Sequence, residues 1–177
     1  MDLENAITIA LNAHKGQIDK GGNPYILHPL RVMLSLTGED ERVVGVLHDV
    51  VEDCAPKDYD WTRVSILNNT TSSISATVEP FTWEYLIQKG LTNKQLEALV
   101  SVSKTPSEEK EYKQISEEEK HKHYLEFIKQ AKSNEIGRRV KEADIKDNLD
   151  TSRISKISTQ DRRRLERYKV ALSYLSS

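Results

Sequence analysis

The sequence predicts an all-α protein, a compact helical bundle of one domain (residues 1–177) with a small β-hairpin inserted at about 61–79. Apolar residues recur at three- and four-residue spacing through most of the chain, as in an amphipathic helix. Capping residues, glycines and prolines divide that pattern into segments. One stretch instead alternates between apolar and polar residues, which is typical of a strand.

The N-terminal part of the chain contains three predicted helices. The first ends before Gly16, and the second begins near Pro29, whose missing N–H is tolerated in a first turn, and stops at Gly38. The third runs from about Asp40 to Cys54. The residues that these helices are expected to bury are Leu3, Ala6, Ile7, Ala10, Ala13, Leu30, Met33, Leu34, Val43, Val44, Leu47, Val50 and Val51.

The segment 55–80 has a different pattern. Apolar residues alternate with polar ones on both sides of a polar turn at 68–73, which predicts a β-hairpin between helices. A Ser/Thr-rich loop is the alternative interpretation. The alternating residues are Val64, Ile66, Ile74, Ala76 and Val78.

Helical signals return after the insert. Thr92 and Gln95 form a capping-box pattern at the start of one of these helices. The segment 108–120 is highly charged and is expected to be an exposed connector. The predicted helices of this part are 82–90, 92–100, 124–131, one that begins near 136, and 161–175.

Composition excludes several classes of function. The net charge of -2, with 31% charged and 37% apolar residues, lacks the basic excess of a nucleic-acid binder. Asp2 and Glu4 occupy the region where a signal peptide needs positive charge, and no stretch approaches the ~20 apolar residues of a membrane span. Cys54 is the single cysteine, so no internal disulfide is expected. We therefore expect a cytoplasmic protein without nucleic-acid or membrane partners.

Four ionisable residues crowd one predicted helical segment. On a helix His48 and Glu52 share a face, as do Asp49 and Asp53. Carboxylates this close repel one another unless a positive charge compensates them, and a divalent cation is the simplest compensation. Imidazole combined with carboxylates suits Mn²⁺, Fe²⁺ or Zn²⁺ better than Mg²⁺ or Ca²⁺.

Two other segments carry residues of the same kind. His28 precedes Pro29 at a helix entrance, and Asp144 lies one turn before Asn148. Taken singly, His28 would more often be a helix-entry residue, and Asp144 and Asn148 would be surface positions. Periodicity alone does not bring these segments together in space.

The three segments together resemble the hydrolase domain of the RelA/SpoT family, which is an HD-type domain. They are most similar to the free-standing small alarmone hydrolases, which lack synthetase and regulatory domains. The resemblance runs from the N-terminus to about Arg153, interrupted by the insert. The motifs that carry it are His28-Pro29-Leu30, His48-Asp49-Val50-Val51-Glu52-Asp53 and Ala143-Asp144-Ile145-Lys146-Asp147-Asn148, supported by Ala13-His14-Lys15-Gly16-Gln17 and Pro24-Tyr25-Ile26-Leu27.

The resemblance implies an HD-domain helical bundle that binds one divalent cation. The resemblance implies Mn²⁺ as this cation, and the imidazole and carboxylate donors leave Fe²⁺ or Zn²⁺ as alternatives. Its ligands in this chain would be His28, His48, Asp49 and Asp144. The family reaction removes pyrophosphate from the 3′ position of guanosine tetra- or pentaphosphate, the alarmones of the stringent response.

The same resemblance implies roles for other residues. Glu52 and Asp53 would orient or deprotonate a metal-activated water, and Asn148 would assist at the reacting phosphate or ribose. Lys20, Tyr25 and Asn148 would contact the substrate, a small phosphorylated nucleotide.

Several alternatives stay open. Asp19 stands where the family has a second basic residue that packs on the base, which keeps open a phosphatase for another nucleotide, such as a 2′- or 3′-phosphate. A nucleotide-binding module without turnover is a third hypothesis. Lys20 is equally plausible as a solvated loop charge, and His14 is expected to pack and hydrogen-bond. The insert at 55–80 could cover the site or pair between the subunits of a homo-oligomer.

Overall fold

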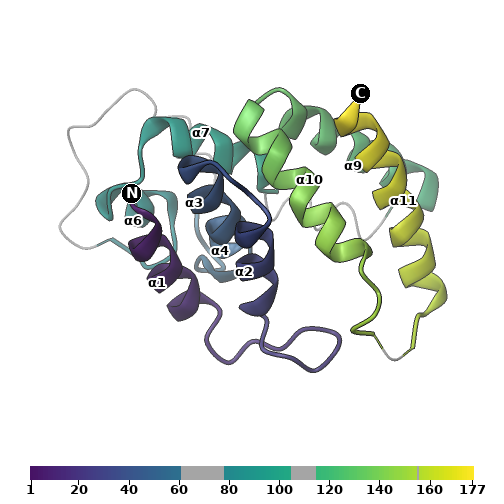
Figure 1. Ribbon diagram of the computed structural model, residues 1–177, viewed down its shortest axis with the longest axis horizontal. Helices are drawn as coiled ribbons and strands as arrows, with labels where there is room; N and C mark the ends of the chain where they lie inside the picture. Colours follow the sequence, from purple (N-terminus) through teal and green to yellow (C-terminus); the bar gives the residue numbers. More distant parts are fainter. Residues whose placement is uncertain (61–77, 105–114, 155) are drawn as a thin grey trace.

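The computed structural model describes residues 1–60, 78–104, 115–154 and 156–177, which form a helical bundle (Figure 1). The predicted all-α fold class is confirmed, because the described residues contain helices and no strand, with one isolated bridge between Ile18 and Pro24. The hairpin predicted at 61–79 falls on residues 61–77, outside the described part. The helices are α1 (Leu3–Ala13), α2 (Leu27–Leu34), α3 (Glu39–Leu47), α4 (Val50–Cys54), α6 (Trp83–Gln88), α7 (Asn93–Val102), α9 (Glu117–Lys132), α10 (Glu135–Leu149) and α11 (Thr159–Ser176).

Cap residues fix several helix starts as the sequence indicates. Asp2 accepts a hydrogen bond from the backbone N–H of Asn5 at the start of α1. Thr92 and Gln95 form the predicted capping box of α7. Pro29 lies in the first turn of the second helix, as predicted, because this helix begins at Leu27, but the helix ends at Leu34, well before Gly38.

The prediction of one continuous helix from Asp40 to Cys54 is wrong. The chain breaks at His48 and Asp49, which separate α3 from α4. The ring Nδ1 of His48 hydrogen-bonds the carbonyl of Gly45 at 2.8 Å, an acceptor that the Asp49 amide would use in an uninterrupted helix. Asp49 has φ −99° and ψ −6°, in the sparsely populated bridge region where many active-site residues lie.

Helix α9 starts earlier than the apolar pattern indicates. The segment 108–120 was expected to be a connector, yet residues 117–120 are helical. Ser116 caps the helix and Glu119 completes a capping box, with its carboxylate 2.9 Å from the Ser116 amide. The Ser-x-x-Glu signature was present in the sequence, but the charged composition around it concealed the helix start.

Helix α10 lies between the two parts of the hydrophobic core. The larger part joins α1, α2, α3, α4, α6 and α7 to the first half of α10, and a smaller part packs α9 and α11 against its other side (Figure 1). Gly137 allows α10 to approach α7 closely, because a Cβ at this position would overlap Oγ of Ser101. The second half of α10 is thereby fixed opposite the start of α2 and the break between α3 and α4.

Among the described residues, every helix falls short of the length and apolar character that a bilayer crossing requires.

Candidate metal centre

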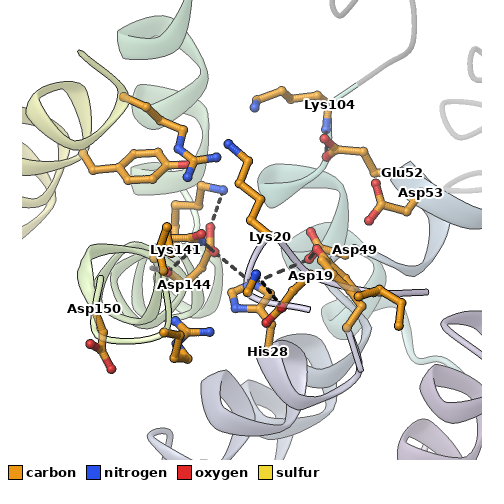
Figure 2. Close-up of a pocket in the computed structure, with 18 residues that line it drawn as sticks. Asp19, Lys20, His28, Asp49, Glu52, Asp53, Lys104, Lys141, Asp144 and Asp150 are labelled. Carbon is orange, nitrogen blue, oxygen red and sulfur yellow. Dashed lines mark hydrogen bonds and ion pairs between the residues drawn. The ribbon is translucent and has the colours of Figure 1, made fainter. Parts of the chain in front are cut away.

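Three segments distant in the sequence meet at one point. His28 comes from the first turn of α2, His48 and Asp49 from the break after α3, and Asp144 from α10. The Nε2 atom of His28 lies 3.3 Å from Oδ1 of Asp144 and 3.7 Å from Oδ2 of Asp49 (Figure 2). The Nε2 atom of His48 lies 3.1 Å from Asp49 Oδ2 and 3.8 Å from Asp144 Oδ1. The structure thus brings together all four residues that the sequence indicated as ligands.

The donor atoms suit a divalent cation. Ligand atoms of His28, His48 and Asp144 lie within 4.8 Å of one another, and these residues are 8%, 2% and 7% exposed. Among the described residues the buried Nε2 atom of His48 has no hydrogen-bond partner, and it lies 3.1 Å from Oδ2 of Asp49. An unpartnered buried imidazole nitrogen is costly unless something binds it. Two imidazoles with two carboxylates match the preferences of Mn²⁺, Fe²⁺ and Zn²⁺.

Both carboxylates of this set have hydrogen-bond donors of their own. The Tyr25 hydroxyl donates to Oδ2 of Asp49 at 2.6 Å. Asp144 accepts from Lys141 Nζ at 2.7 Å and from Asn148 Nδ2 at 2.6 Å. Such outer contacts orient metal-binding side chains before a cation arrives.

Both histidines also have outer partners. His48 uses Nδ1 to contact the carbonyl of Gly45, and His28 Nδ1 lies 2.7 Å from Oδ2 of Asp147. Because a carbonyl or carboxylate oxygen only accepts, each Nδ1 carries the hydrogen of its contact. When the rings are neutral, each Nε2 therefore has its lone pair directed at the cluster.

The charges on the four proposed ligands favour the exchange of a bound proton for a metal cation. Burial lowers the pKa of His28, but hydrogen bonds to Asp144 and Asp147 outweigh it and raise the pKa to about 10. Burial likewise opposes a charged His48, but Asp49 raises its pKa above the ordinary value. Burial alone would raise the pKa of Asp144, whereas Lys141 and His28 hold it well below the usual range. Without a cation, the protonated ring of His28 supplies positive charge beside the carboxylates.

Glu52 and Asp53 lie on the opposite side of the site from Asp144 and Lys141 (Figure 2). Glu52 is held by the backbone N–H of Lys104, which donates to its Oε2 at 2.9 Å. Burial raises the pKa of the Glu52 carboxyl above its ordinary value. Glu52 is partly exposed, and a carboxylate whose pKa is raised accepts a proton more readily than an ordinary one.

A cavity of about 370 Å³ opens above these groups, and the predicted site residues line it except for the deeper His48. The resemblance indicated Lys20 as a substrate contact, and Lys104 adds a second positive charge to the cavity lining. The sequence did not single out Lys141, Arg164 or Tyr168 as site residues, although they line the same cavity. The sequence pattern at Lys141 and Arg164 is only a weak indication of a site, because basic residues spaced along a helix usually belong to a solvated face.

Three residues make contacts that the sequence did not indicate. Tyr25 lines the cavity, but its hydroxyl contacts Asp49. Lys20 also lines the cavity and pairs with Asp161 of α11, Nζ to Oδ1 at 2.8 Å. Asp19 uses Oδ1 to accept the backbone N–H groups of Gly21 and Asn23, each at 2.8 Å, and so stabilises its own loop.

His14 packs and hydrogen-bonds, in agreement with its sequence interpretation. It is buried, its Nδ1 lies 2.9 Å from Oε1 of Gln17, and its ring packs against the ring of Tyr25. It does not line the cavity.

The chain resembles part of several known proteins. It is 36% identical over 67 residues to a GTP pyrophosphokinase of Myxococcus xanthus. The matched segment covers 35% of this chain and 9% of that protein. It is 38% identical over 56 residues to guanosine-3′,5′-bis(diphosphate) 3′-pyrophosphohydrolase of Vibrio cholerae serotype O1 (29% of this chain, 8% of that protein). A Borreliella burgdorferi protein with the same name is 34% identical over 76 residues (37% and 11%).

These distant partial relatives are members of the RelA/SpoT family. The matched segments span only about a tenth of the length of these relatives. The names give two activities, pyrophosphate transfer and pyrophosphate removal. No family model matches the chain.

Proposed function

We propose that this chain is a metal-dependent pyrophosphohydrolase that removes the 3′-pyrophosphate of guanosine 3′,5′-bis(diphosphate). The observation that carries the proposal is the convergence of two imidazoles and two carboxylates beneath a cavity with cationic walls. The partial relatives from Vibrio cholerae and Borreliella burgdorferi support the substrate, because their names state this activity.

The cation would be held by His28, His48, Asp49 and Asp144. Mn²⁺ fits this mixed nitrogen and oxygen donor set, and Fe²⁺ or Zn²⁺ would fit it as well. When bound, such a cation lowers the pKa of a water molecule and neutralises charge that develops on phosphoryl oxygens.

The acidic residues on α4 would accept the proton of the attacking water and orient this water. The Lys104 amide occupies Oε2 of Glu52 and so fixes the orientation of this carboxylate at the cavity wall. Its raised pKa makes it a better proton acceptor than an ordinary glutamate, as a general base requires. Asp53 lines the same wall and would help to orient the water.

The basic residues would bind the substrate phosphates. Lys104 lies over the rings of Phe127 and Tyr124, and burial lowers its pKa, so an anionic phosphate would stabilise its charged form. Arg164 adds a guanidinium to the same cavity, and such a group binds phosphate oxygens in pairs. Lys20 would join them by exchanging Asp161 for a phosphate. Asn148 already donates to Asp144, so its contribution to substrate binding would be made from a fixed position.

A phosphatase for another phosphorylated nucleotide is the second candidate. Asp19 favours it, because this acid lines the cavity where the family resemblance places a base-packing basic residue. A carboxylate does not stack on a purine as a guanidinium does.

Product analysis separates the two. The purified protein is incubated with Mn²⁺ and either guanosine 3′,5′-bis(diphosphate) or nucleotides with a single 2′- or 3′-phosphate, and products are identified by ³¹P NMR. We expect equal amounts of guanosine diphosphate and pyrophosphate from the first substrate. Orthophosphate from the other nucleotides would favour the phosphatase, and nucleotide binding without turnover would favour a binding module.

Two histidine variants control this experiment. His48→Ala removes a proposed ligand and should abolish turnover. His123→Ala removes an exposed histidine of α9 and should leave turnover unchanged. Activity that survives the first substitution would come from a contaminant or from another site.

A further inference from the structure

Asp147 has an unusual concentration of hydrogen-bond donors. Its carboxylate accepts from His28 Nδ1 at 2.7 Å, from Arg31 Nε at 2.6 Å and Nη2 at 3.1 Å, and from Arg153 Nη2 at 3.0 Å. Arg153 also donates to the backbone carbonyl of Asp147 at 2.6 Å. The side chain is mostly buried, at 12% exposed. A carboxylate that receives this many donors has few orientations available to it.

The contact with His28 determines which nitrogen faces the cluster. A carboxylate can only accept, so Nδ1 holds the hydrogen and Nε2 is left for the cation. A carboxylate partner also makes an imidazole a stronger ligand. His48 has only the neutral carbonyl of Gly45 in the corresponding position, so the two histidines are held in different ways.

The same carboxylate joins the two helices that contribute these ligands. Asp147 lies one turn after Asp144 on α10, and Arg31 lies one turn after His28 on α2. The ion pair between Arg31 and Asp147 therefore connects α2 to α10 directly beside the pair of ligands. The distance between His28 and Asp144 depends on how these helices are held.

We infer that Asp147 is a positioning residue for the proposed cation site, acting through His28 and held by Arg31 and Arg153. Asp147 contacts His28, a proposed metal ligand, and would not contact the substrate. The inference rests on the proposed function, since it assigns Asp147 to the cation that the proposed hydrolase uses.

Direct titration of Mn²⁺, followed by loss of the electron paramagnetic resonance signal of the free ion, tests it. Asp147→Asn should weaken binding about tenfold and Asp147→Ala up to about 100-fold, the range expected for the loss of an outer-shell partner. Glu142→Gln is the matched control, because Glu142 lies on the same helix and pairs with Arg138 and Lys146, away from the ligands. Its affinity for Mn²⁺ should equal that of the unmodified protein.

A double variant separates positioning from net charge. Asp147→Ala with Arg31→Met restores the net charge of the region but leaves His28 without its partner. Affinity should stay low in this variant, and recovery would mean that Asp147 acts only as a countercharge. In the Zn²⁺-loaded protein, nitrogen-15 NMR of the imidazoles should show a protected Nδ1–H for His28 that Asp147→Ala loses.

The outcomes distinguish this inference from the proposed function. An unmodified protein that binds no Mn²⁺ would overturn both. A folded Asp147→Ala variant with unchanged affinity would overturn the positioning role alone. If circular dichroism shows that Asp147→Ala is unfolded, the isosteric variant Asp147→Asn is used in its place. Unchanged Mn²⁺ affinity of Asp147→Asn would then overturn the positioning role.

Discussion

The hydroxyl of Tyr25 donates a 2.6 Å hydrogen bond to Oδ2 of Asp49, a proposed metal ligand. Burial and the nearby carboxylates raise the pKa of Tyr25 far above its ordinary value, so the phenol stays protonated and remains a donor. The resemblance to a known family had suggested a role for Tyr25 in substrate binding. The hydroxyl contact suits Tyr25 to orient Asp49, and the place of Tyr25 in the cavity lining keeps the role in substrate binding open.

Tyr25→Phe separates these two roles. We expect the affinity for Mn²⁺ to fall about tenfold, because Asp49 loses its outer partner. The KM for the nucleotide, measured at saturating Mn²⁺, should stay unchanged. A raised KM with unchanged Mn²⁺ affinity would return Tyr25 to the substrate site.

Glu52→Gln tests the assignment of the general base. Glutamine keeps the acceptor that the Lys104 amide needs but cannot take up a proton. The kcat should fall by a factor of about 10² to 10⁴, whereas Mn²⁺ binding should be retained. A variant with nearly full kcat would transfer the role to Asp53, for which Asp53→Asn is the parallel measurement.

Metal binding should depend on pH. In the metal-free protein His28 has a pKa of about 10, so at neutral pH the cation must displace at least one proton. The affinity for Mn²⁺ should therefore rise with pH between about 6.5 and 10, by up to about tenfold per pH unit for each displaced proton. Calorimetry in buffers of different ionisation enthalpy measures that proton release. An affinity that is constant across this range would contradict the electrostatic account.

The same pKa shift has a consequence for stability. The folded-state pKa of His28 lies above its unfolded value of about 6.5, so its contribution to stability is complete below that pH. This contribution is lost as the pH rises through about 10. The melting temperature of the metal-free protein should fall over this interval, and saturating Mn²⁺ should reduce the fall.

Gly137→Ala tests how the fold positions Asp144. A methyl group at this position would overlap Oγ of Ser101, so either this hydroxyl must leave its hydrogen bond to the Ala98 carbonyl or α10 must move away from α7. We expect a loss of about 1–3 kcal/mol in the free energy of unfolding, together with weaker Mn²⁺ binding. Ser101→Ala in the same chain removes the overlapping hydroxyl and should recover most of the loss. If the double variant does not regain stability, the overlap with the Ser101 hydroxyl is not what makes Gly137→Ala destabilising.

The sequence was informative where structure depends on local patterns. Apolar periodicity located the helices, because burial repeats with the helical turn. It did not indicate the break at His48 and Asp49, since the buried residues Val50 and Val51 continue the apolar pattern beyond it. At the break the His48 side chain contacts the Gly45 carbonyl, and composition does not reveal such a contact.

The site residues could be predicted only from their sequence motifs. His28 and Asp147 are 119 positions apart, and Lys20 and Asp161 are 141 apart. Such pairs depend on how whole helices pack, and single-sequence periodicity contains no information on that packing. The motif resemblance identified the four proposed ligands, and the structure added the side chains that hold them in place.

The most direct test of the account is the stoichiometry of Mn²⁺ binding by the purified protein, compared with that of His48→Ala. The buried Nε2 of His48 lies 3.1 Å from Asp49 Oδ2 and 3.8 Å from Asp144 Oδ1, so the proposed cation would bind among these three atoms. We predict one Mn²⁺ per chain in the unmodified protein and a loss of that binding in the variant. Equal binding by both proteins, or none by the unmodified chain, would contradict the central claim.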